Sequence, residues 1–409
     1  MKLIPPLDLT IPNPDSTTTY DLLSKYLSTQ FQLLTKLPGK LSLVSPGVDL
    51  TQMEAQVRAL AADAPGSLFS VLRRPTVGGP LRCLNNQLNG SEKRIRELVA
   101  LLASHLYFEL ALDGVAVQSG MITDPPLALI SLGSRCTLEL ESDTQRIEFV
   151  DSCLVAHGAS QSRKYDLSEL KAGNKHHEIR DSLLLSLIDN NPQSALEAHP
   201  EKSGNAVDLG EKSVDQWLGS LREALTLVER FLPELDQEIT LLAHQIVPVG
   251  YHDERHMSAS YQEVIGNIYM TLHPDPLTLA EAIVHEFSHN KVNLLFSLDA
   301  VLENAFYPLY SSPVRPDPRP LHGVLLAVHA FLPVERMYER MILAEHSLCE
   351  HPRFIARRQQ VRANNQAATE TVMANGIATP VGQGVLDEIS RWNAYFALGG
   401  SKSGASCSR

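Results

Sequence analysis

One run of residues constrains the fold of this chain more than any other: residues 277–299, LTLAEAIVHEFSHNKVNLLFSLD. Its apolar residues recur at the three- and four-residue spacing of a helix, and they do not alternate as in a strand. Asp275 or Thr278 is suited to cap the first turn, and Pro276 is suited to the first helical position. The run therefore predicts a long and mostly apolar helix.

The same run contains the pattern H-E-x-x-H, formed by His285, Glu286 and His289. Side chains four apart on a helix project from one face, so the two imidazoles can bind a single metal ion. Glu286 lies about 100° around the helix, where it can reach a metal-bound water or a substrate. Two solvated surface histidines are the alternative, but burying these groups in an apolar helix without a partner costs free energy. We predict a metal site, with Glu286 as its catalytic residue.

A catalytic metal site of this kind needs a third protein ligand. His322 and His329 lie in the helical pattern that starts at Leu321, and at seven residues apart they share a face. We favour His329 as the third ligand because its neighbours are apolar. His322 is the second candidate. Glu303 or Asp299 is the acidic alternative, and Glu303 faces the same side as the motif only if that helix runs unbroken to it.

A proline-rich loop precedes the expected third ligand. Residues 307–320 contain five prolines, and Arg315 and Arg319 lie four residues apart within the loop. A guanidinium held near a metal is suited to bidentate binding of a carboxylate. A salt bridge to Asp317 is the alternative for either arginine. We expect at least one of them to bind an anion.

The rest of the chain predicts a mainly α (α+β) fold. Helical patterns cover 18–37, 51–62, 91–113, 213–246 with a break at Pro233, 321–348 interrupted at Pro333, and two stretches of 352–398. Three or four short alternating segments between 127 and 158 predict a small antiparallel sheet. Residues 66–79 are rich in helix breakers, 160–181 resemble a polar connector, and 183–188 fit either a strand or a buried helical turn.

These patterns suggest four regions along the chain. We expect a mostly helical N-terminal region of unassigned role at 1–125 and a small β region with a connector at 126–180. The metal-binding helical domain is expected at 181–398, followed by a flexible tail at 399–409 whose composition is Gly- and Ser-rich.

Composition excludes several classes of protein. A net charge of −12 gives the chain no electrostatic reason to bind nucleic acid or an anionic membrane. No run of 18 apolar residues is present, and the N-terminal segment lacks the apolar core of a signal peptide, so we expect a cytoplasmic protein. The five cysteines are scattered without a C-x-x-C pair, which fits reduced thiols.

Two stretches are similar to those of a known family: AEAIVHEFSHNKVNLLFSLD and YSSPVRPDPRPLHGVLLAVHAFLPV. They resemble the HExxH-motif peptide-modification proteins, which are 2-oxoglutarate-dependent peptide β-hydroxylases. The likeness extends upstream to LIDNNPQSALEAHP, to the helix at Trp217 and to SASYQEVIGNIYMTLHPDPL, and covers roughly residues 180–345. Residues 1–125 show no such resemblance.

The resemblance implies an Fe(II) oxygenase that uses 2-oxoglutarate and O2 to hydroxylate the β-carbon of a residue in a peptide. The expected substrate is a ribosomally made precursor peptide with a leader, as in natural-product biosynthesis. His285 and His289, with His329, are then the iron ligands, and Arg315 or Arg319 holds the distal carboxylate of 2-oxoglutarate. Three histidines depart from the usual pair of histidines with one carboxylate.

Two other functions remain open from the sequence. A zinc metallopeptidase would use Glu286 as a general base, although that chemistry does not need the proline–arginine loop. A non-catalytic binding protein would hold a structural metal with four closed ligands. The oligomeric state is open in each case.

Overall fold

The computed structural model describes residues 3–41, 47–194, 198–199, 202–203, 205–313 and 317–399. It is mainly helical with small sheets, as the helical and strand patterns of the sequence predicted. The backbone packs into two compact units, each assembled from separated segments. The first unit comprises Met1–Ser24, Gly219–Leu242 and His273–Arg409, and the second comprises Lys25–Leu218 and Ala243–Leu272. The four consecutive regions expected from the sequence stay a prediction, and of the expected tail 399–409 only Gly399 is described.

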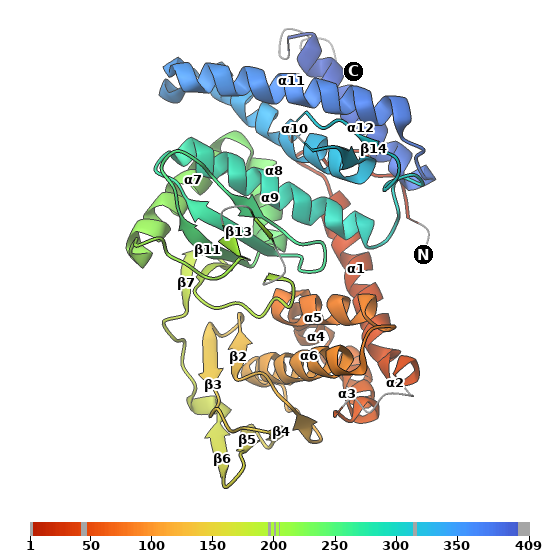
Figure 1. Cartoon of the computed structure of the whole chain (residues 1–409), viewed down its shortest axis with the longest axis vertical. Coiled ribbons are helices and arrows are strands. Elements are labelled where there is room, and N and C mark those ends of the chain that lie inside the picture. Colours follow the sequence, from red (N-terminus) through yellow and green to blue (C-terminus); the bar gives the residue numbers. More distant parts are fainter. Residues whose placement is uncertain are drawn as a thin grey trace. The chain divides into compact units, whose positions relative to one another are not determined.

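The helices of the second unit pack around α6 (Glu92–Leu112), whose inner face is buried along most of its length (Figure 1). The others are α2 (Leu37–Lys40), α3 (Leu50–Asp63), α4 (Pro65–Arg73) and α5 (Pro75–Asn86), with the C-terminal part of α1 (Thr18–Thr35). The breaker-rich stretch 66–79 is therefore helical. Pro65 and Pro75 each stand in a first helical turn, where the missing N–H leaves no bond unmade.

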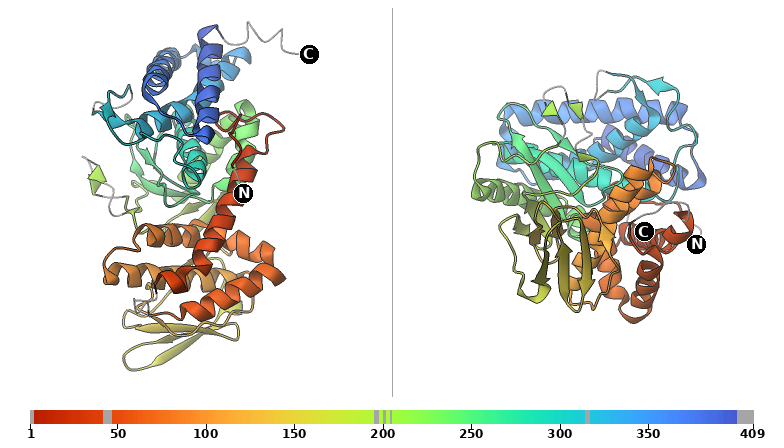
Figure 2. Two further views of the ribbon diagram at one scale, coloured as in Figure 1. Left: turned by 90° about the vertical axis from the view of Figure 1, so that its right-hand side faces the viewer. Right: turned by 60° about the horizontal axis from the view of Figure 1, so that its bottom comes forward.

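Short antiparallel strands complete the core of the second unit (Figure 2). They are the hairpin β2 (Ala128–Ser131) and β3 (Cys136–Glu139), and a sheet of order β1-β4-β5-β6 made of Ile122–Thr123, Arg146–Val150, Cys153–His157 and Ser162–Asp166. The expected antiparallel region near 127–158 is thus confirmed. The polar connector expected at 160–181 was wrong, because it contains β6 and β7 (His176–Arg180). β6 is an edge strand whose side chains are mostly exposed, so it has no apolar alternation to reveal it.

A mixed five-stranded sheet has the order β12-β13-β11-β8-β7. Its central strands β13 (Asn267–Leu272), β11 (Gln245–Tyr251) and β8 (Leu183–Ser186) are parallel, whereas β7 and β12 (Ser258–Ala259) pair antiparallel at its edges. The segment 183–188 therefore forms a strand. The sequence did not predict the parallel core of this sheet, because periodicity alone does not report which strands pair. A two-residue pair, β9 (Ala198–His199) with β10 (Lys202–Ser203), is separate.

The first unit is a group of helices centred on α10 (Leu321–Leu343), which packs against α9, α11 and α12 (Figure 1). Those helices are α9 (Pro276–Phe296), α11 (Pro352–Asn375) and α12 (Pro380–Ala397), accompanied by α8 (Pro233–Leu242) and the C-terminal part of α7 (Val214–Phe231). The expected interruption at Pro333 was wrong, since α10 continues through it. Burial of α10 among three helices offsets the lost hydrogen bond. Two short strands, β14 (Leu309–Tyr310) and β15 (Arg319–Pro320), precede α10.

Residues 8–11, called the N-terminal arm below, are buried within the first unit. The backbone N–H groups of Thr10 and Ile11 donate to the Glu388 carboxylate of α12, at 2.9 and 3.1 Å from its Oε1. Glu388 is fully buried, as is Leu9 beside this contact in the sequence. The arm is therefore an integral part of the first unit although it was expected from the sequence only as an N-terminal segment of unassigned role.

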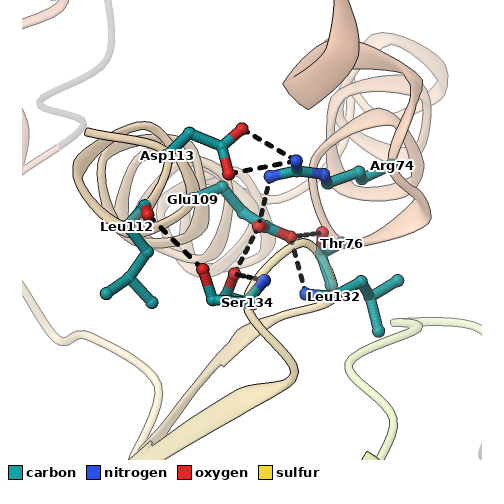
Figure 3. Close-up of polar contacts among 8 residues, drawn as sticks. Arg74, Thr76, Glu109, Leu112, Asp113, Leu132 and Ser134 are labelled. Carbon is teal, nitrogen blue, oxygen red and sulfur yellow. Dashed lines mark hydrogen bonds and ion pairs between the residues drawn. The ribbon is translucent and has the colours of Figure 1, made fainter. Parts of the chain in front are cut away.

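A buried carboxylate, Glu109 of α6, holds together three parts of the second unit (Figure 3). Its oxygens accept hydrogen bonds from Arg74 Nη1 (2.7 Å), Thr76 Oγ1 (2.7 Å), Ser131 Oγ (2.7 Å) and Leu132 N (3.0 Å). The Arg74 guanidinium also donates to Asp113, at 2.7 Å. The carboxylate is thus fully hydrogen-bonded, as a buried charge must be to persist in a folded protein.

A second buried group in α6 predicts how stability responds to acid. His105 is fully buried, its Nδ1–H donates to the Leu101 carbonyl at 2.9 Å, and burial lowers its pKa to about 4. In the unfolded chain the imidazole of His105 is protonated below about pH 6.5, but in the folded chain it stays neutral down to about pH 4. The free energy of unfolding therefore falls as the pH is lowered from about 6.5 towards 4. We expect this histidine to account for about 2 kcal/mol of the loss between pH 6.5 and 5.

The measurement is urea unfolding of the wild type and of His105→Gln at pH 7 and at pH 5. The variant should lose less stability between the two pH values than the wild type does. Equal losses in the two proteins would show that His105 is not a buried neutral group in solution.

No helix in the described part of the chain is both long and apolar enough to cross a membrane.

Candidate metal centre

The helix that carries the H-E-x-x-H motif starts where the sequence predicted. The Asp275 carboxylate caps α9 by accepting from Leu277 N at 3.1 Å and from Thr278 Oγ1 at 2.8 Å. Pro276 takes the first turn, and α9 ends at Phe296. Because the start is fixed by this cap, the positions of His285 and His289 on the helix follow from the regular helical rise.

The three motif residues converge. The Nε2 atoms of His285 and His289 are 2.9 Å apart, and the two rings are nearly perpendicular, at 81°. With a carboxylate oxygen of Glu286, the potential ligand atoms all lie within 4.8 Å of one another. Two imidazole nitrogens this close share either a proton or a cation, because their lone pairs otherwise repel. The donor set of two imidazoles and a carboxylate therefore fits a divalent transition metal.

The surroundings of the pair favour neutral imidazoles, the form that binds metal. Burial lowers the pKa of His289 to about 4. The ring of His285 packs against Phe331 of α10, with 4.4 Å between the ring centroids. The two histidines are half-buried and Glu286 is buried, so the group lies at the boundary between the packed helices and solvent.

His329, the favoured third ligand, does not belong to this converging group. It is fully buried on α10, and its Nδ1 shares a hydrogen bond of 3.1 Å with the hydroxyl of Thr10 in the N-terminal arm. Its pKa lies well below the usual value, mainly through burial and also through the positive charges of Lys291 and His289. Lys291 is itself buried and ion-paired with Glu238. The other ring nitrogen of His329, Nε2, is buried and has no hydrogen-bond partner among the described residues, and the ligand role of His329 stays a prediction.

His322 lies between two aromatic rings. Its ring is 4.4 Å from that of Phe296 on α9 and 5.4 Å from that of Phe306, centroid to centroid. Burial lowers its pKa, and the charge of His289 lowers it further. His322 therefore lies on the side of α9 from which His289 projects.

The acidic alternatives have other contacts. Since α9 ends at Phe296, the unbroken helix that would align Glu303 with the motif is absent. Glu303 is exposed, and its backbone N–H donates to the Ile377 carbonyl. The carboxylate of Asp299 accepts from Val301 N at 2.8 Å and from Thr379 Oγ1 at 2.6 Å, so it holds a turn.

Of the two arginines in the proline-rich loop, Arg319 is among the described residues. Arg315 lies outside the described residues. Arg319, in β15, places its Nε 3.0 Å from a carboxylate oxygen of Asp317, which is the salt bridge considered as an alternative from the sequence. Its side chain is about one-third exposed. Binding of an anionic cosubstrate by either arginine stays a prediction.

Some neighbours of the site had a signal in the sequence and others had none. Phe296 follows His289 by seven residues, so helical periodicity places it on the same face. Thr10 contacts His329 across 319 residues, and no local pattern reports such a pair. The packing of Phe331 against His285 depends on how α9 and α10 cross, which the sequence also does not report.

The fold and the site together define a mainly helical protein with a candidate metal-binding group on α9. Neither the protein-family models nor the curated proteins compared with this sequence match it.

Proposed function

We propose that this chain is an Fe(II)- and 2-oxoglutarate-dependent oxygenase that hydroxylates the β-carbon of a residue in a peptide. Its H-E-x-x-H motif and its proline-rich loop resemble those of the peptide β-hydroxylases. One distance is the main support: the 2.9 Å between the Nε2 atoms of His285 and His289. The two ring nitrogens converge closely enough for one ion to take both as ligands. An ion held mainly by two imidazoles would keep coordination positions for a cosubstrate and for oxygen.

The proposed roles follow from position and charge. His285 and His289 hold Fe(II), which when bound supplies the oxidising chemistry, and Phe331 fixes the ring of His285 by packing against it. Arg319 has guanidinium nitrogens besides the Nε that contacts Asp317, so it can form a bidentate pair with the distal carboxylate of 2-oxoglutarate. One oxygen atom of O2 enters the peptide C–H bond, the other enters succinate, and CO2 leaves.

The direct test is anaerobic loading with Fe(II), followed by addition of oxygen and 2-oxoglutarate with and without a candidate precursor peptide. We expect succinate, together with a gain of one oxygen atom in the mass of the peptide. An Arg319→Ala variant should raise the KM for 2-oxoglutarate, whereas Arg353→Ala, at an exposed position of α11, should not. Absence of succinate under every condition would overturn the proposal.

A zinc metallopeptidase is the second candidate, and the buried carboxylate of Glu286 within 4.8 Å of both histidine nitrogens supports it. A general base at that place activates water for hydrolysis. Glu286→Gln separates the two functions. It should lower peptidase turnover by about 10²–10⁴-fold but leave an oxygenase within about ten-fold of the wild type.

The control for this variant is Glu370→Gln, on an exposed position of α11. It should leave succinate formation and any zinc-dependent cleavage unchanged. Loss of zinc-dependent cleavage in Glu286→Gln alone, without succinate from the wild type, would establish the peptidase.

A further inference from the structure

An exposed apolar surface lies on the segment that joins α9 to α10. The side chains of Phe306, Tyr307 and Leu309 are 62%, 81% and 53% exposed, and Ile377 is 55% exposed. Ile377 adjoins the segment because Glu303 N donates to its carbonyl at 2.7 Å and its own N–H donates to the Asn304 side chain at 2.9 Å. We call these four side chains the apolar edge. Large exposed apolar side chains on adjoining segments are typical of a binding surface.

The apolar edge is connected to the candidate metal centre through aromatic contacts. The ring of Phe306 stacks on His322 at 26°, and His322 in turn packs on Phe296 of α9. Phe296 lies seven residues after His289, a helical rise of about 10 Å. With the two ring contacts from Phe306 to Phe296 included, the path from the apolar edge to His289 is about 20 Å, which an extended chain covers with about six residues. A segment bound on the apolar edge therefore reaches the His285–His289 pair with a residue about six positions along.

The backbone next to these side chains is suited to an extended ligand. β14 pairs antiparallel with β15, Leu309 with Pro320 and Tyr310 with Arg319, and within the described residues this sheet has two strands. Its outer edge provides backbone groups for a further strand, a recurrent way of binding peptides irrespective of their sequence. Every second side chain of the added strand would then point towards the apolar edge, and we expect those side chains to be apolar.

We propose that the apolar edge, with the outer side of β14, is the docking surface for the peptide substrate, which binds as an added strand with an apolar side chain about six residues from the modified residue. The proposal rests on the proposed function for its occupant. A second copy of the chain fits less well, because a stable dimer needs about 20–30 residues a side and the apolar edge has four.

The test is a selection of linear peptides that needs no turnover. An mRNA-displayed library of random dodecapeptides is selected on the Fe(II)-loaded chain without oxygen. The variants are Leu309→Ser and Tyr307→Ser, both of highly exposed side chains, and the matched control is Leu343→Ser, at 56% exposure near the end of α10. Wild type and Leu343→Ser should enrich the same apolar-containing peptides, and the two edge variants should bind them about ten-fold more weakly.

Equal binding by the edge variants, or no enrichment by the wild type, overturns the docking surface. So does a dimer that Leu309→Ser converts to a monomer while peptide affinity is unchanged, which would make the edge a contact between copies. Because binding is measured without catalysis, the outcome is independent of the succinate assay. Peptide binding lost in Leu309→Ser, with no succinate from the wild type, supports the surface and rejects the oxygenase.

Discussion

Replacing His289 with alanine is expected to lower the bound metal from about one ion per chain to nearly none. The Nε2 atoms of His285 and His289 are 2.9 Å apart, so removal of either ring leaves the ion with only one imidazole of this pair. The metal-free fold should tolerate the change, because the ring that is removed is a desolvated polar group whose pKa burial has lowered to about 4. The measurement is metal content by mass spectrometry after anaerobic loading and desalting, with circular dichroism as the check of folding.

The matched control is His351→Ser in the same unit. His351 is exposed and caps α11 by accepting from Arg353 N at 3.2 Å, and serine retains that capping role. It should bind metal as the wild type does. A folded His289→Ala protein that still retains a stoichiometric ion would place the metal elsewhere in the chain.

Replacing Glu109 with alanine is expected to destabilise the second unit by about 3–5 kcal/mol. The change leaves the buried Arg74 guanidinium with Asp113 as its remaining carboxylate partner among the contacts described. It also removes the acceptor of two hydroxyl groups and of the Leu132 N–H, each of which is then left without that bond. Stability is measured by urea unfolding in a Trp392→Phe background, so that Trp217, which is buried and assigned to the second unit, reports the transition.

The control is Glu97→Gln on the same helix. Glu97 pairs with Arg94 at 3.1 Å, but both side chains are substantially exposed, and such pairs contribute about 0–1 kcal/mol. A cost below about 1 kcal/mol for Glu109→Ala would mean that the Arg74 cluster reorganises or hydrates readily.

Local features of the site were predictable from the sequence. The spacing of His285 and His289 needs only a helix, and the Asp275 cap fixes where that helix begins. Features of the site that depend on distant segments were not predictable from the sequence. His329 was favoured as a ligand because its neighbours are apolar, and that role stays a prediction, whereas no local pattern reports its contact with Thr10.

The same difference between local patterns and contacts of distant segments decides which parts of the fold were predictable. Helices with regular apolar spacing were predicted, whereas α4 and α5 were obscured by prolines and glycines that packing accommodates. Gly79, for example, lies so close to Val264 that an added Cβ would stand 3.2 Å from its side chain. The polar edge strand β6 had no periodicity to recognise. The two compact units could not be found from consecutive stretches, because each is assembled from segments far apart in the chain.

The arm bound by Glu388 has a consequence for the order of events during synthesis on the ribosome. All segments of the second unit have been made once Leu272 emerges, so that unit can fold while the chain is still growing. The first unit cannot, because Thr10 and Ile11 must wait for a carboxylate 378 and 377 residues later in the sequence. Contacts of such long separation form slowly. The helix with the candidate metal group therefore reaches its final packing after translation of α12, and a metal ion is best supplied to the completed chain.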